Sequence, residues 1–186
     1  PSMVTIGVFD GVHIGHQQLI RRLVTEARAA HQLAVVVTFF PHPDVVLRGL
    51  QGRYYLTTPE QKAAVLLSLG VDYVITYPFS REASQVRAAD FVDQLISHLH
   101  LKTLWVGADF AMGYKREGNV AFLQAQGEQK GFTVNPFDLV ANGGGKISST
   151  TIRQAVQAGE METARAWLGR PYAVTGTVIH GEKRGR

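Results

Sequence analysis

Short runs of apolar residues alternate along this chain with longer segments in which apolar side chains recur every three or four positions. A run at 3–9 ends in turn residues, and from Gly15 onward the apolar residues repeat at helical spacing. A continuous apolar run at 33–40 is typical of a parallel strand covered on both faces, and Pro41 and Pro43 end it because proline cannot extend a central ladder. The chain is therefore predicted to open with a strand, a glycine-rich turn, a helix and a second strand.

The same alternation continues to residue 169. Thr58, Pro59 and Gln61 supply an N-cap, a first-turn proline and a capping-box glutamine, and Gly70 ends the helix that they begin. The residues expected to face inward from that helix are Ala63, Leu66, Leu67 and Leu69. Further strands are expected at 73–77, 103–107 and 132–139, and further helices at 88–99, 119–130, 151–158 and 162–168. This order predicts an α/β fold, a Rossmann-like open parallel sheet with helices on both faces.

Ligands of such sheets bind at the carboxyl ends of the strands, near the point where the strand order reverses. The turn after the first strand, residues 7–16, reads Gly-Val-Phe-Asp-Gly-Val-His-Ile-Gly-His. Gly7, Gly11 and Gly15 allow backbone N–H groups to approach an anion, and the start of the following helix adds a partial positive charge. This turn is therefore a candidate phosphate site.

Two imidazoles lie in the same turn, three positions apart. His13 and His16 are predicted to donate hydrogen bonds to phosphate oxygens and to stabilise negative charge that develops in a transition state. The same residues are compatible with a capped turn that contains core histidines, and with a His-x-x-His metal site. Both alternatives remain open at this point.

A second candidate anion site precedes the helix expected at 151–158. Residues 146–153 read Lys-Ile-Ser-Ser-Thr-Thr-Ile-Arg, which places four hydroxyls between two basic residues. One Ser or Thr suffices as an N-cap, so the additional hydroxyls with Lys146 and Arg153 favour anion binding at the helix N-terminus. The alternative is an ordinary helix N-cap that has more hydroxyl side chains than it needs. The P-loop pattern does not fit, because Ile147 follows Lys146 and position 140 is valine.

Composition narrows the class of protein. The 186 residues are 45% hydrophobic and 18% charged, which is typical of a globular protein. Lys and Arg number 19 against 15 Asp and Glu, and this net charge of +4 is spread along the chain, which favours a phosphate-bearing ligand over nucleic acid. No apolar window is long enough to predict a membrane span. Since the chain has no cysteine, disulfides and thiolate chemistry are excluded, and a cytoplasmic location is expected.

Five motifs occur in a fixed order. They are Gly-x-Phe-Asp-Gly-x-His-x-Gly-His at 7–16, Thr-Phe-x-Pro-His-Pro at 38–43, Leu-Thr-Thr-Pro-Glu-x-Lys at 56–62, Val-Gly-x-Asp-Phe at 106–110 and Ile-Ser-Ser-Thr-x-Ile-Arg at 147–153. The first alone marks only the wider nucleotidyltransferase superfamily. Together, over nearly the whole chain, they resemble the adenylyltransferase domain of bacterial bifunctional riboflavin kinase/FAD synthetase.

The resemblance implies a nucleotidyltransferase-type fold and FMN adenylyltransferase activity, in which AMP passes from ATP to FMN by direct in-line attack and leaves FAD and pyrophosphate. Mg²⁺ would accompany ATP, and the metal ligands are unknown. The residues that it implies to be catalytic are His13, His16 and Arg153. Those implied to bind ATP are Gly7, Phe9, Asp10, Gly11, Gly15, Lys146, Ser148, Ser149 and Thr150. Those implied to bind the flavin are Pro41, His42, Pro43, Asp109 and Phe110.

Other features of the resemblance bear on domains and specificity. Phe40 stands where several relatives carry an acidic residue, and Met112 where an aromatic residue is common.

We expect residues 1–169 to form the adenylyltransferase domain, and 170–186 to be the opening strand and loop of a riboflavin kinase barrel, with a strand at 172–180. Kinase activity would then belong to a longer parent protein. A same-fold enzyme with another acceptor, such as phosphopantetheine or nicotinate mononucleotide, and a non-catalytic nucleotide-binding module remain alternatives, and the oligomeric state is open.

Overall fold

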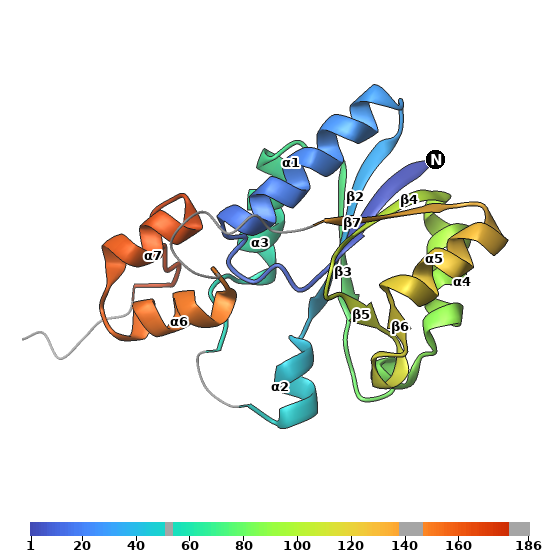
Figure 1. Cartoon of the computed structure of the whole chain (residues 1–186). Helices are drawn as coiled ribbons and strands as arrows, with labels where there is room; N and C mark the ends of the chain where they lie inside the picture. The colour runs from blue at the N-terminus through green and yellow to red at the C-terminus, as the bar shows by residue number, and fades with distance from the viewer. Residues whose placement is uncertain (51–53, 138–146, 179–186) are drawn as a thin grey trace, which may run out of the picture.

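Five strands form a parallel sheet in the order β3-β2-β1-β4-β7 in the computed structural model, which describes residues 1–50, 54–137 and 147–178 (Figure 1). These strands are β1 (Ser2–Ile6), β2 (Leu33–Phe40), β3 (Tyr73–Pro78), β4 (Leu101–Gly107) and β7 (Thr133–Phe137). A separate antiparallel pair consists of β5 (Ala111–Met112) and β6 (Gly118–Asn119). The helices are α1 (Ile14–Ala29), α2 (Pro43–Arg48), α3 (Pro59–Ser68), α4 (Ala88–Leu99), α5 (Val120–Lys130), α6 (Ser149–Gln157) and α7 (Met161–Leu168). The predicted α/β fold with an open parallel sheet is confirmed.

The order of the strands reverses beside β1. The chain runs outward from β1 to β2 and β3, then returns to the other side of β1 with β4, so that Val4 of β1 pairs with Val35 on one side and with Leu104 on the other. In open α/β sheets a crevice forms at the carboxyl ends of the two strands where such a reversal occurs. The turn after β1 and the residues after β4 therefore share the expected ligand-binding edge.

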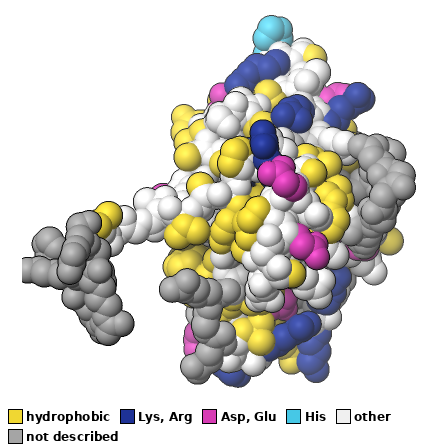
Figure 2. All heavy atoms as spheres, turned by 90° about the vertical axis from the view of Figure 1, so that its left-hand side faces the viewer, with side chains coloured by type: hydrophobic (Ala, Val, Ile, Leu, Met, Phe, Trp, Pro, Cys, Tyr) yellow, Lys and Arg dark blue, Asp and Glu magenta, His cyan; other side chains and the backbone are white. Residues whose placement is uncertain are grey.

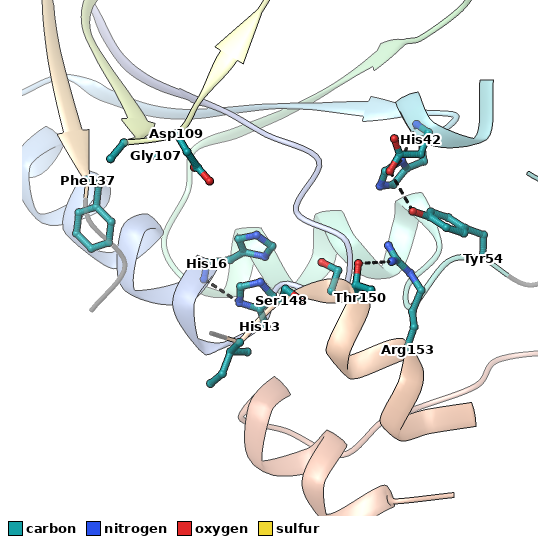
Figure 3. Close-up of a pocket in the computed structure, with 14 residues that line it drawn as sticks. His13, His16, His42, Tyr54, Gly107, Asp109, Phe137, Ser148, Thr150 and Arg153 are labelled. Carbon is teal, nitrogen blue, oxygen red and sulfur yellow. Dashed lines mark hydrogen bonds and ion pairs between the residues drawn. The ribbon is translucent and has the colours of Figure 1, made fainter. Parts of the chain in front are cut away.

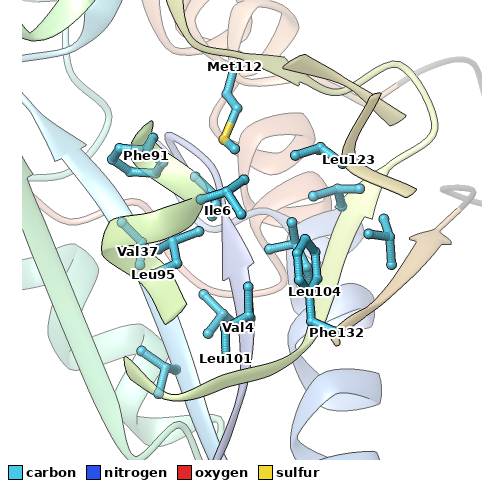
Figure 4. Close-up of a cluster of buried hydrophobic side chains, with 14 residues drawn as sticks. Val4, Ile6, Val37, Phe91, Leu95, Leu101, Leu104, Met112, Leu123 and Phe132 are labelled. Carbon is cyan, nitrogen blue, oxygen red and sulfur yellow. The ribbon is translucent and has the colours of Figure 1, made fainter. Parts of the chain in front are cut away.

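Helices cover both faces of the sheet. On one face, α4 and α5 pack Phe91, Leu95 and Leu123 against Val4 and Leu104 of the central strands (Figure 4). On the other face, a second apolar cluster joins α1 and α3 to the sheet and contains Leu19, Ile20, Leu23, Leu66, Val36 and Trp105. Side chains that alternate between the two faces are thus buried on both along β1 and the middle of β2, which explains why these strands are mainly apolar; the buried exceptions are Ser2, Thr5 and Thr38.

The start of α3 has the predicted capping box. The Thr58 hydroxyl accepts a hydrogen bond of 3.2 Å from the N–H of Gln61, and the Gln61 side chain accepts one of 3.0 Å from the N–H of Thr58. The expected inward face is correct for Leu66, which is fully buried, and wrong for Leu67, which is 49% exposed. Lys62 is buried instead, because it lies four residues before Leu66 and so on the same face of the helix.

The two C-terminal helices, α6 and α7, pack against each other beside the sheet rather than on it (Figure 1). Their shared core contains Ile152, Ala155, Ala164 and Leu168 together with Leu56, which precedes α3. This contact brings the N-terminus of α6 next to the turn that follows β1. On the face that carries these helices, basic, acidic and hydrophobic side chains are interspersed, so the small net positive charge does not form a continuous basic surface there (Figure 2).

The strand expected at 172–180 is not present in the described residues. Residues 171–178 have no regular secondary structure, and Val174 and Val178 are 82% and 97% exposed. The alternating pattern shows only that one face could be apolar, whereas a strand requires a hydrogen-bonding neighbour, and none pairs with 171–178 in the described chain. Residues 179–180, and residues 138–139 of the strand expected at 132–139, lie outside the described residues, as does Lys146.

Candidate active site

A cavity of about 500 Å³ lies at the carboxyl ends of β1, β2, β4 and β7 (Figure 3). The wall is formed by the segments that follow β1 and β2, the ends of β4 and β7, and the start of α6. The lining residues are His13, His16, His42, Asp44, Tyr54, Gly107, Ala108, Asp109, Phe137, Ile147, Ser148, Ser149, Thr150 and Arg153. Segments that are far apart in the sequence therefore meet at the strand-order reversal, where the sheet topology places a ligand.

His13 and His16 lie side by side in this cavity (Figure 3). His13 is the N-cap of α1, and its Nδ1 accepts a hydrogen bond of 3.3 Å from the N–H of His16. The two rings are nearly parallel, with centroids 3.6 Å apart. Because Nδ1 of His13 is an acceptor, the proton of the neutral ring lies on Nε2, which makes Nε2–H a hydrogen-bond donor.

Burial keeps both imidazoles neutral in the ligand-free protein. Desolvation lowers the pKa of His13 from 6.5 to about 4, and the nearby carboxylate of Asp10 opposes that change. Desolvation also lowers the pKa of His16 well below its ordinary value, and the charges of His13 and Lys62 lower it further. Neutral N–H donors of this kind can stabilise charge that develops on a phosphate.

The backbone of the turn after β1 is strained. Phe9 and Val12 have positive φ angles of 51° and 40°, which are unusual for residues with a Cβ and most of all for a β-branched one. The Phe9 ring is buried against the edge of His16, with centroids 5.1 Å apart, and also approaches Gly7, where a Cβ would lie 2.8 Å from it. Gly7 and Phe9 thus support the histidines from behind the cavity wall.

Gly11 does not offer its N–H to the cavity, contrary to the sequence-based expectation for this glycine. Its N–H donates a hydrogen bond of 3.1 Å to the Thr57 hydroxyl, and its φ of +76° accounts for the glycine. Its carbonyl accepts a hydrogen bond of 2.7 Å from Arg170, whose guanidinium also donates to the Val12 carbonyl at 3.2 Å. Gly15 lies in the first turn of α1. The turn is thus held by side-chain contacts on its far side.

Asp10 is buried behind the cavity, where its carboxylate links three segments. It accepts hydrogen bonds of 3.0 Å from the N–H of Leu56, 3.2 Å from the N–H of Thr57 and 3.1 Å from Nη2 of Arg153. Its main-chain carbonyl accepts a further bond of 2.9 Å from the Ser149 hydroxyl. The aspartate therefore fixes the start of α6 against the turn after β1.

The hydroxyls at the start of α6 divide into two groups. Ser148 is the N-cap and forms a capping box with Thr151, so the cap accounts for two of the four hydroxyls. Ser149 is tied to Asp10, while Thr150 lines the cavity and contacts Arg153 at 3.5 Å (Figure 3). An N-cap alone does not explain this arrangement, which leaves the helix N-terminus facing the cavity beside a guanidinium group.

Tyr54 and Asp44 line the cavity although no motif pointed to them. The Arg153 guanidinium lies 4.1 Å from the centroid of the Tyr54 ring, and the Tyr54 hydroxyl donates to Asp44 at 3.3 Å. Desolvation raises the pKa of Tyr54, which keeps its hydroxyl protonated. Asp44 directly follows the Pro-His-Pro motif, which was the available signal; Tyr54 follows no recognisable pattern.

Two of the five residues expected on the flavin side line the cavity. His42 lines the cavity; it caps α2 by accepting a 3.0 Å hydrogen bond at Nδ1 from the N–H of Asp44, and burial lowers its pKa. Asp109 also lines the cavity, at the end of β4. The remaining three, Pro41, Pro43 and Phe110, do not line it.

The two positions that depart from the family pattern also lie away from the cavity wall. Met112 is buried in the core beneath α4 and α5. Phe40 is 38% exposed and packs on Tyr55, with ring centroids 5.5 Å apart.

The described residues contain no group of three or more His, Asp or Glu side chains placed to hold a metal ion. A His-x-x-His metal site at His13 and His16 therefore lacks a third ligand within that part of the chain. The carboxylates on the cavity wall are those of Asp44 and Asp109.

Across the described ranges, no helix is both long and apolar enough to cross a membrane.

A parallel sheet with its order reversed beside β1, a His-x-Gly-His turn and a helix N-terminus at one cavity define an α/β domain of the nucleotidyltransferase type. The family model for FAD synthetase matches residues 1–151, and the chain belongs to this family. The match covers the turn after β1 and the start of α6.

Individual relatives of known name are also similar to this chain. The chain is 40% identical over 186 residues to the bifunctional riboflavin kinase/FMN adenylyltransferase of Listeria monocytogenes, covering 100% of this chain and 59% of the relative. It is 38% identical over 185 residues to the protein of the same name from Escherichia coli K12, covering 99% and 59%. A crystal structure titled macrolide-efflux protein from Streptococcus pneumoniae is similar with a TM-score of 0.87 and 30% identity, covering 99% of this chain and 60% of that one. The chain thus spans about 60% of the length of these proteins.

Proposed function

We propose that this chain is an FMN adenylyltransferase that transfers AMP from ATP to FMN and releases FAD and pyrophosphate. The observation that carries the proposal is the meeting of two anion-binding elements at one cavity: the neutral imidazoles of His13 and His16, and the N-terminus of α6 with Thr150 and Arg153. Family membership and the relatives named FMN adenylyltransferase support the same reaction.

The reaction requires no covalent enzyme intermediate. A terminal phosphate oxygen of FMN attacks the α-phosphorus of ATP, the new P–O bond forms, and the bond from the α-phosphorus to the pyrophosphate oxygen breaks, so the electron pair leaves with pyrophosphate. Both substrates are anions, so the site must hold them together and stabilise the charge on the α-phosphate. The N–H groups of His13 and His16 and the guanidinium of Arg153 supply donors for this charge.

ATP is placed at the reversal between β1 and β4, with its phosphates across His13, His16 and the start of α6. FMN is placed toward the end of β2, where His42 lies on the wall. Asp44 and Asp109 are the carboxylates of the wall that would hold Mg²⁺, which would neutralise phosphate charge; Mg²⁺ commonly uses only one or two carboxylates besides phosphates and water. Lys146 and Gly15 are retained as ATP contacts, and Pro41, Pro43 and Phe110 as supports of the flavin side.

The test is incubation of the chain with ATP, Mg²⁺ and FMN, with FAD followed by chromatography and pyrophosphate by a coupled assay. Equal amounts of FAD and pyrophosphate are expected. Parallel reactions contain nicotinate mononucleotide or phosphopantetheine in place of FMN, and turnover with one of these but not with FMN would assign another acceptor. ATP binding without release of pyrophosphate in the presence of any of these acceptors would indicate a non-catalytic nucleotide-binding module.

A further reaction tests the domain proposal. We assign residues 1–169 to the adenylyltransferase domain and 170–186 to the opening of a riboflavin kinase domain in a longer, cytoplasmic parent. Riboflavin with ATP should then give no FMN with this chain. Formation of FMN would show that the kinase activity does not depend on further sequence.

A further inference from the structure

Lys62, on α3, is only 5% exposed although its side chain ends in an ammonium group. Its Nζ donates a hydrogen bond of 2.8 Å to the Thr38 hydroxyl, one of 3.0 Å to the Val8 carbonyl and a longer one of 3.4 Å to the Phe39 carbonyl. The Thr38 hydroxyl itself donates to the Val8 carbonyl at 2.9 Å. The ammonium group thus ties the carboxyl end of β2 to the turn that follows β1.

Packing alone does not account for a lysine at this position. Within the described parts of the chain no carboxylate forms an ion pair with Lys62, and burial lowers its pKa while the more distant charge of Asp10 opposes that change. Removing an ammonium group from water without a carboxylate partner is costly, and an apolar side chain of equal length would fill the same space without that cost. The position of the charge therefore needs another explanation.

The ammonium group of Lys62 lies between the two sides of the cavity. Its bond to Val8 reaches the turn that precedes His13 and His16, on the side assigned to ATP. Its bonds to Thr38 and Phe39 reach the end of β2, ahead of His42, on the side assigned to FMN. Desolvation lowers the pKa of His16 most, and the charges of His13 and Lys62 lower it further.

We propose that Lys62 is a positioning residue for adenylyl transfer. It fixes the turn after β1 relative to the segment that carries His42, and it places a buried positive charge between the sites of two anionic substrates. The three hydrogens of its ammonium group are directed to Val8, Thr38 and Phe39, so it acts through these contacts and its field rather than by touching a substrate. The inference rests on the proposed function, because the two anions are ATP and FMN.

The principal variant is Lys62→Met, which keeps the length of the side chain and removes the charge and the donors. In the full chain, NMR titration of the imidazole signals should show His16 protonating at higher pH than in the wild type. The kcat for FAD formation should fall by about 10²-fold, the scale of a small misplacement of reacting groups, with smaller changes in the KM values for ATP and FMN. Lys130→Met is the matched control, since Lys130 pairs with Asp93 on the surface.

Two further variants separate the charge from the hydrogen bonds. Lys62→Arg keeps the charge, so His16 should titrate as in the wild type while kcat recovers only in part. Thr38→Val removes the hydroxyl between Lys62 and Val8 and keeps the charge, so kcat should fall with an unchanged His16 titration. These variants carry the test even if Lys62→Met does not fold.

An active wild type together with a Lys62→Met variant of unchanged kcat and unchanged His16 titration would overturn the inference and leave the proposed function intact. A wild type that makes no FAD would instead overturn the proposed function, and with it the positioning role. A Lys62→Met variant with a lower kcat, the same thermal unfolding temperature as the wild type and a shifted His16 titration would support the inference, because a merely structural residue would not alter that titration.

Discussion

The carboxylate of Asp10 accepts a hydrogen bond of 3.1 Å from the guanidinium of Arg153, a residue 143 positions later in the chain. Both side chains are nearly buried, with exposed fractions of 3% and 12%. The pair therefore joins the turn after β1 to the first turns of α6, and the two anion-binding elements of the cavity are held at a fixed distance by one ionic contact.

Replacement of Asp10 by Asn should destabilise the protein. The amide keeps the shape and part of the hydrogen bonding but leaves the Arg153 charge buried without its partner, and breaking a buried pair in this way costs about 3–5 kcal/mol. Urea unfolding would measure the loss in the free energy of unfolding. Asp93→Asn is the control, because its pair with Lys130 is on the surface and should contribute less than about 1 kcal/mol. Equal effects of the two variants would contradict the role given to Asp10.

Removal of either imidazole should impair catalysis. We expect His13→Ala and His16→Ala each to lower kcat for FAD formation by about 10²–10³-fold, the scale of losing one preorganised donor to a developing charge. Steady-state kinetics with FMN and ATP would measure the change, and His98→Ala, an exposed residue near the end of α4, should behave as the wild type. Nearly normal turnover in both site variants would rule out the proposed arrangement of donors.

The stability of the protein should fall in weak acid because of His13. Burial lowers the pKa of this imidazole in the folded state to about 4, whereas the unfolded chain protonates near 6.5. Between these two pH values the unfolded state binds more protons than the folded state. The contribution of His13 to the free energy of unfolding is therefore complete above about pH 6.5 and is lost as the pH falls toward 4. This contribution amounts to about 3 kcal/mol. Unfolding measured at several pH values should give a shallower dependence for His13→Gln than for the wild type or His98→Gln. An identical dependence in all three proteins would show that His13 does not have the lowered pKa.

Arg170 should support the strained turn without reaching the cavity. Its guanidinium donates to the carbonyls of Gly11, Val12 and Leu168, and burial lowers its pKa. Loss of such charged donors in Arg170→Met should cost about 2 kcal/mol and reduce kcat/KM for ATP roughly tenfold. Kinetics and calorimetric ATP binding would measure this effect. Arg165→Met is the control variant, because it removes only an exposed pair with Glu162. If the two variants bound ATP equally well, Arg170 would not support the turn as proposed.

The elements with clear boundaries could be predicted from the sequence. The bounds of β2 and α4 agree with the predicted 33–40 and 88–99. Prolines end the apolar run of β2, and the apolar face of α4, with Phe91, Val92 and Leu95 buried, shows a clear helical period. The six-residue helix α2 and the two-residue strands β5 and β6 are too short to show a period, and they were missed.

The residues of the site likewise divide into those that the sequence indicated and those that it did not. His13 and His16 could be found because they lie in one turn, whereas Asp44 and Tyr54 reach the cavity only through tertiary packing. Lys62 ends the motif at 56–62, so the sequence marked the residue, but its burial follows only from the packing of α3 against the sheet.

The stacking of the two imidazoles also affects the thermodynamics of nucleotide binding. Rings 3.6 Å apart cannot both carry a positive charge at low cost, but one of them can become protonated when phosphates arrive. Association with ATP near neutral pH would then withdraw a proton from the solution, and the heat measured in calorimetry would vary with the ionisation enthalpy of the buffer. The apparent affinity would strengthen as the medium becomes more acidic, and the close contact of the two rings would limit this uptake to one of them.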